Sequence, residues 1–104
     1  MGLYGIYGNH SAESCPLYNT ENRDLIIKMN EQLKEIANKN NIKILQQYHS
    51  ALEHTFIWVV DAKEAHSVQN FMIDSGWAKF NAVKIVPLGS YEHLIEACKG
   101  LRRE

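Results

Sequence analysis

Two strand-like segments that follow one another closely place the strongest constraint on the fold of this chain. Residues 42–50 and 54–60 are separated only by a short connection around Ala51 and Leu52, which predicts a β-hairpin. A segment of helical periodicity lies on each side of the hairpin, because apolar side chains recur there every three or four residues. These side chains are Leu25, Ile26, Met29, Leu33, Ile36 and Ala37 before the hairpin and Ala65, Val68, Phe71 and Met72 after it.

Further strands are predicted at residues 2–9, which carry aromatic and β-branched side chains between glycines, and at residues 82–88. Ser90 is expected to cap a last helix. Its apolar positions are Tyr91, Leu94, Ile95, Cys98 and Leu101, all expected in the core. The order β-α-β-β-α-β predicts an α+β, ferredoxin-like fold with an extra C-terminal helix. Its first and third strands should be central and antiparallel, and residues 1–104 should form a single domain.

Composition narrows the classes of function. The formal net charge is −1 and the basic residues are spread along the chain, so the basic patch that binds phosphate backbones is missing and nucleic acid is disfavoured. The longest apolar run, Phe56–Val60, is far shorter than the ~20 residues that span a bilayer. Cys15 and Cys98 form no C-x-x-C motif, which suits a reducing compartment. A cytoplasmic protein without membrane contact is expected.

Three histidines are predicted to meet at one edge of the sheet. His10 ends the first strand, and His49 and His54 lie at the two inner ends of the hairpin. A symmetric hairpin loop would place His49 directly across from His54. Glu13 and Cys15 lie in the adjoining loop. Imidazole, thiolate and carboxylate groups are ligands suited to nickel, zinc or copper, so all five residues are candidate metal ligands.

Alternation along the hairpin assigns its side chains to two faces. The face expected to lie under the helices carries Ile42, Ile44, Ile57 and Val59. The opposite, open face is expected to carry Gln47, His49, His54, Phe56 and Trp58. Exposed aromatic side chains mark an interface or a ligand site, so two sheets are expected to pack face to face in a homodimer or a higher homo-oligomer. A small-ligand pocket would then be lined by Tyr4, Ile6, Gln47, Phe56 and Trp58. The same side chains could equally form the dimer core.

The run Ile85-Val-Pro-Leu-Gly-Ser-Tyr-Glu92, which follows Trp77-Ala-Lys-Phe80, resembles the dimeric α+β-barrel superfamily, particularly small proteins similar to muconolactone isomerase. The resemblance implies a homodimer whose facing sheets enclose a pocket. Members of that superfamily include isomerases, cofactor-free monooxygenases, haem-modifying enzymes and metal binders. The resemblance transfers no catalytic motif to individual residues.

Two functions follow as hypotheses. The first is a dimeric protein that binds a small ligand or a divalent metal in a histidine-containing pocket. The second is a cofactor-free isomerase or monooxygenase in which His49 and His54 carry out acid–base catalysis on a small organic substrate. Cys15 is either a nucleophile or a structural residue, and the histidines could instead be solvated turn residues. Whether the chain is an enzyme stays open at this point.

Overall fold

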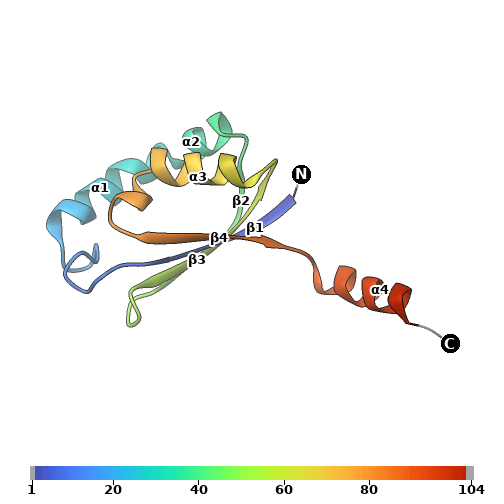
Figure 1. Cartoon of the computed structure of the whole chain (residues 1–104). Helices are drawn as coiled ribbons and strands as arrows, with labels where there is room; N and C mark the ends of the chain where they lie inside the picture. Colours follow the sequence, from blue (N-terminus) through green and yellow to red (C-terminus); the bar gives the residue numbers. More distant parts are fainter. Residues whose placement is uncertain (1, 103–104) are drawn as a thin grey trace.

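The computed structural model describes residues 2–102, and a four-stranded sheet forms its centre (Figure 1). The strands are β1 (Gly2–Asn9), β2 (Lys43–Ser50), β3 (Thr55–Ala62) and β4 (Ala82–Leu88). They lie in the order β2-β3-β1-β4, and each neighbouring pair is antiparallel. The predicted α+β class is confirmed, as is the central position of the first and third strands.

Three helices cover one face of the sheet (Figure 1). They are α1 (Thr20–Asn30), α2 (Leu33–Lys39) and α3 (Ala65–Asp74), and a short 3-10 helix, η1 (Trp77–Lys79), leads from α3 to β4. The segment predicted as one helix before the hairpin forms two, because the chain turns at Gln32, whose N–H bonds to the carbonyl of Met29 only three residues earlier. This turn directs Leu33 and Ala37 of α2 toward the core, where both are buried.

The hydrophobic core fills the space between the sheet and the helices α2 and α3. Its buried side chains are Ile6, Leu33, Ala37, Ile42, Phe56, Trp58, Val60, Ala62, Val68, Phe71 and Met72. Phe56 and Trp58 are only 1% and 3% exposed, and their rings contact each other and the ring of Trp77 at centroid distances of 5.2 Å. The aromatic side chains of β3 are therefore the centre of this core.

The predicted assignment of the β3 faces was wrong. Phe56 and Trp58 point toward the helices, whereas Ile57 is 44% exposed on the open face. Alternation separates the two sets of side chains but does not say which set is buried, and the large aromatic rings gain more from burial than Ile57 and Val59. Ile6, Phe56 and Trp58 therefore lie in the core, not on the open face. Tyr4 packs against the same core, and Gln47, opposite Trp58, lies on the helix-covered side. Contact of these side chains with a ligand stays a prediction.

The hairpin loop differs from the symmetric one expected. His49 lies opposite Phe56, and Ser50 lies opposite Thr55. The prediction that His49 and His54 are cross-strand neighbours was therefore wrong. A bulge between Ile44 and Gln46 shifts the register of β2. Because of this extra residue, Ile44 and His49 both lie on the helix-covered side of the sheet.

The last helix, α4 (Tyr91–Leu101), stands away from the rest of the molecule beyond the end of β4 (Figure 1). Ser90 caps it as predicted, since its hydroxyl accepts a hydrogen bond from the His93 N–H at 3.0 Å. The prediction that its apolar side chains are buried was wrong: α4 has no buried residue, and Cys98 is exposed. None of the helices in residues 2–102 is long and apolar enough to cross a membrane.

Candidate metal centre

The loop between β1 and α1 fixes the position of Cys15. The carbonyl of Cys15 accepts hydrogen bonds from the N–H groups of Tyr18 and Asn19, at 2.9 and 2.7 Å. The neighbouring carbonyl of Ser14 accepts a bond of 2.7 Å from the side-chain amide of Asn22 in α1. Cys15 itself is fully buried. The loop therefore holds its thiol in one place beneath the surface, and both Cys15 and Cys98 are free thiols.

His10 follows β1 and is oriented by a pair of hydrogen bonds. The side-chain amide of Asn81 donates to the carbonyl of Trp77 at 2.9 Å, so the Asn81 oxygen faces the imidazole of His10. That oxygen lies 2.7 Å from Nδ1 of His10, and it can only accept a hydrogen bond. Nδ1 therefore carries the proton, and Nε2 presents a lone pair. Nε2 is buried and has no hydrogen-bond partner within residues 2–102.

His54 closes the hairpin loop in a left-handed backbone conformation, with φ of 56°. Few residues other than glycine adopt this conformation, although histidine does so more often than most. The carbonyl of His54 accepts a hydrogen bond of 3.1 Å from the His10 N–H, which joins the hairpin to the end of β1. Nδ1 of His54 is buried and, among the described residues, has no partner.

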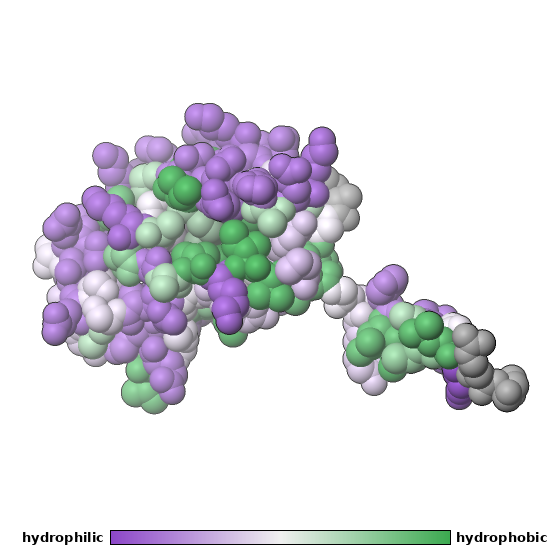
Figure 2. Space-filling view, in the orientation of Figure 1, coloured by the Kyte–Doolittle hydropathy of each residue, from purple (hydrophilic) through white to green (hydrophobic). Residues whose placement is uncertain are grey.

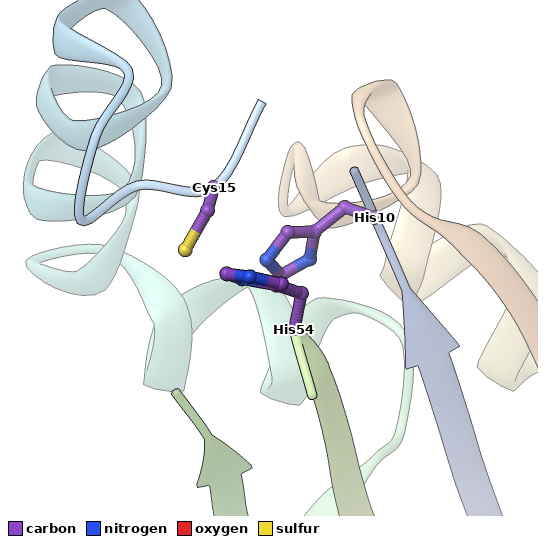
Figure 3. A group of neighbouring side chains, drawn as sticks. All are labelled: His10, Cys15 and His54. Carbon is purple, nitrogen blue, oxygen red and sulfur yellow. The ribbon is translucent and has the colours of Figure 1, made fainter. Parts of the chain in front are cut away.

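The side chains of His10, Cys15 and His54 converge from three separate segments of the chain (Figure 3). One ligand atom from each lies within 4.8 Å of the other two. Tetrahedral zinc with bonds of ~2.0–2.3 Å would separate its ligand atoms by about 3.3–3.8 Å. The three atoms thus need to approach one another by only about 1 Å to bind one such ion.

The structure brings together three of the five predicted metal ligands. His49 lies beside the group, with its ring stacked on that of His10 at 6.0 Å and an interplanar angle of 11°. Glu13 is exposed, and only its backbone carbonyl has a hydrogen bond within the loop, which it accepts from the side-chain amide of Asn19. Sequence reasoning missed Asn81, which orients His10. Its position just before β4 is a signal that could have found it, because the start of that strand lies at the same sheet edge.

The ring of His49 lies close to two other imidazoles. The pKa of His49 is lowered from its ordinary value of 6.5, first by partial burial of its ring and then by the neighbouring His10 and His54. Both effects disfavour the charged imidazolium. His49 is therefore neutral at neutral pH and able to accept a proton.

This lowered pKa predicts a pH dependence of stability. Because the folded protein holds the His49 proton less tightly than the unfolded chain does, stability should fall as the pH drops through about 6.5 toward the lowered pKa. In His49→Gln this contribution is absent, so less stability should be lost on acidification. Urea unfolding about one pH unit above and below 6.5 measures the difference. The exposed His66→Gln variant is the control, and a His49→Gln protein as pH-sensitive as the wild type would contradict the prediction.

Comparison with known proteins identifies one domain family. The family described as "Domain of unknown function (DUF3303)" matches residues 14–102, a segment that includes Cys15 and His54 but begins after His10. No curated protein matches the chain.

Proposed function

Because the chain belongs to the DUF3303 family, whose function is unknown, we propose a function from its own side chains: it binds one divalent transition metal ion through His10, Cys15 and His54. The observation that carries this proposal is the pair of buried imidazole nitrogens, Nε2 of His10 and Nδ1 of His54, which have no partner among the described residues. A buried polar atom without a partner is costly. A metal ion held with the thiolate of Cys15 would satisfy this group of side chains.

The donor set favours particular metals. Two imidazoles and one thiolate exclude magnesium and calcium, which prefer oxygen ligands. They suit zinc, copper or nickel. Three protein ligands leave a fourth position open, as in catalytic zinc sites, where a water or a small ligand completes the tetrahedron. Because the thiol must lose its proton to bind the metal, the site requires a reduced Cys15, and we propose a cytoplasmic location for this reason.

A zinc titration of the full chain without a histidine tag tests the proposal. Cys98→Ser serves as the background, because the exposed Cys98 thiol would bind metal on its own. We expect uptake of one zinc per chain, a rise in thermal stability with added zinc because only the folded state holds the site, and proton release from the thiol. Copper and nickel are titrated in the same way, and if none of the three metals binds, the proposal is wrong.

An enzyme that needs no cofactor is the second candidate. The neutral imidazole of His49 supports it, since that form accepts a proton from a substrate, and His54 would be the second acid–base residue. The substrate would be a small aromatic or lactone-like compound. Turnover that survives removal of metal by a chelator but disappears in His49→Ala would favour this candidate. Turnover lost on chelation would exclude it.

We further propose that the fold is ferredoxin-like and that two copies pair through their open sheet faces, as in dimeric α+β barrels. The strand order β2-β3-β1-β4 supports the fold assignment. Exposed apolar side chains on the open face support the pairing. Tyr7 and Tyr48 lie on either side of Ile57 in the register, and the three are 37%, 62% and 44% exposed. Such a patch is typical of an interface.

A further inference from the structure

The helix α4 has an apolar surface that no other part of residues 2–102 covers. Tyr91, Leu94 and Leu101 are 74%, 56% and 80% exposed, and Figure 2 shows hydrophobic residues over much of the visible face of this helix. An isolated helix of 11 residues is marginal in water, because helices shorter than about 12–15 residues rarely hold together without packing. The helix therefore needs a partner surface to be stable.

The position of α4 indicates where that partner lies. In Figure 1 the helix lies beyond the end of β4 and is displaced to the side of the sheet opposite α1, α2 and α3. That side is the open face. A second sheet packed face to face would lie about 10 Å from the first, which places it on the same side as α4.

We propose that α4 is a dimerisation arm that packs against a second copy of this chain. This inference rests on the proposed pairing of the open faces. Each chain has two uncovered apolar surfaces, the α4 stripe and the open face. In a dimer with two-fold symmetry, a single interface can bury both surfaces of both copies. The two-residue connection Gly89–Ser90 between β4 and α4 leaves little chain for folding the helix back onto its own sheet.

The area required by a stable dimer supports a role for the arm. Four strands about 4.8 Å apart and about 26 Å long give the open face a footprint of about 500 Å². A stable interface buries about 800 Å² per partner. A helix of 11 residues is about 16 Å long and about 10 Å wide, so it adds about 160 Å². The arm therefore enlarges the footprint of the sheet face by about a third, which favours an interface of the usual size.

The apolar centre of the open face also suits a second copy of the same chain. The register places Lys43 opposite Asp61 near one end of the sheet, where the two charges offset each other. The middle of the face is occupied by Ile57, Val59 and the neighbouring tyrosines. Lys84 on the edge strand β4, opposite one of these tyrosines, adds a further positive charge at the rim. The apolar centre of this face is typical of homodimer interfaces.

Sedimentation equilibrium on the full chain under reducing conditions tests the arm. Reducing agent excludes dimers joined through the exposed Cys98. The wild type should be a dimer at micromolar concentration. Leu94→Glu places a charge on the arm and should weaken the dimer by at least about tenfold, since a buried charge without a partner is strongly unfavourable. Ile57→Glu, on the open face, should dissociate it.

The matched control is Ile27→Glu on α1, where the isoleucine is 59% exposed on the opposite side of the sheet. This variant should remain a dimer. If Ile57→Glu dissociates the dimer but Leu94→Glu leaves the dimer affinity unchanged, the proposal that α4 is a dimerisation arm is wrong. The proposed pairing of the open faces would still stand. A wild-type monomer, or dissociation by Ile27→Glu as well, refutes both. Zinc uptake by Ile57→Glu should be normal, which separates these results from the metal proposal.

Discussion

Cys15→Ser should lower the affinity for zinc by more than about 100-fold, because loss of a direct ligand exceeds the ~10–100-fold cost of changing an outer-shell partner. The serine hydroxyl is nearly the same size as the thiol, but it does not ionise near neutral pH and is a poor ligand for a transition metal. Because Cys15 is fully buried, the slightly smaller and more polar hydroxyl also costs some stability, so circular dichroism is used to check that the variant is folded. Isothermal titration with zinc measures the change directly.

Two matched variants identify the site as the cause. His66 and His93 are exposed and lie outside the group of converging side chains, so His66→Ala should bind zinc like the background protein. His10→Ala should show a loss similar to that of Cys15→Ser. Equal zinc affinity in His10→Ala and His66→Ala would mean that the metal binds elsewhere.

Asn81 offers a finer test of the geometry. Its side-chain oxygen lies 2.7 Å from Nδ1 of His10 and keeps the proton on that nitrogen. Nε2 is therefore left free to bind the metal. Asn81→Ala should therefore cost about 10–100-fold in zinc affinity, as other outer-shell partners of metal-bound histidines do. Asn81→Asp keeps an acceptor at the same place and should restore most of the affinity. A merely structural role for Asn81 would not produce that rescue.

The sequence was sufficient to predict which segments meet at the site. Topology alone placed the end of β1, the loop that follows β1, and both inner ends of the hairpin at one sheet edge. His10, Cys15 and His54 do converge there. It was not sufficient to separate ligands from neighbours. His49 and Glu13 occupy the same edge, and only the hairpin register and the loop hydrogen bonds decide that one stacks on His10 while the other faces solvent.

The same limit applies to the fold. Periodicity identified the strands and helices, but two features depend on tertiary contacts. The buried face of β3 was decided by how Phe56 and Trp58 pack against α3 and Trp77. The apolar stripe of α4 predicted burial, yet no surface within residues 2–102 covers it. An apolar stripe on a helix indicates that this face is suited to burial. It does not indicate whether the covering surface belongs to the same chain.

Gly8→Ala should be strongly destabilising, because the ring of Phe56 occupies the space that a side chain at position 8 would need. A Cβ atom at Gly8 would come within 2.1–2.8 Å of three Phe56 ring atoms, far inside van der Waals contact. Phe56 is 1% exposed and lies directly opposite Gly8 in the register of β1 and β3. It is also enclosed by Trp58 and Trp77, so the ring has little room to move. Overpacking of this kind costs about 1–3 kcal/mol or more.

A double-mutant cycle shows whether this clash is the cause. In Phe56→Leu the smaller side chain leaves a cavity and destabilises the protein on its own, but it also vacates the space beside Gly8. Adding Gly8→Ala to Phe56→Leu should therefore cost much less than adding it to the wild type, with a coupling of about 1–3 kcal/mol measured by urea unfolding. Gly100→Ala is the control, because nothing lies within 4 Å of its added methyl group, and alanine should favour the helix. Strictly additive effects of Gly8→Ala and Phe56→Leu would show that the packing of β1 against Phe56 is looser than described.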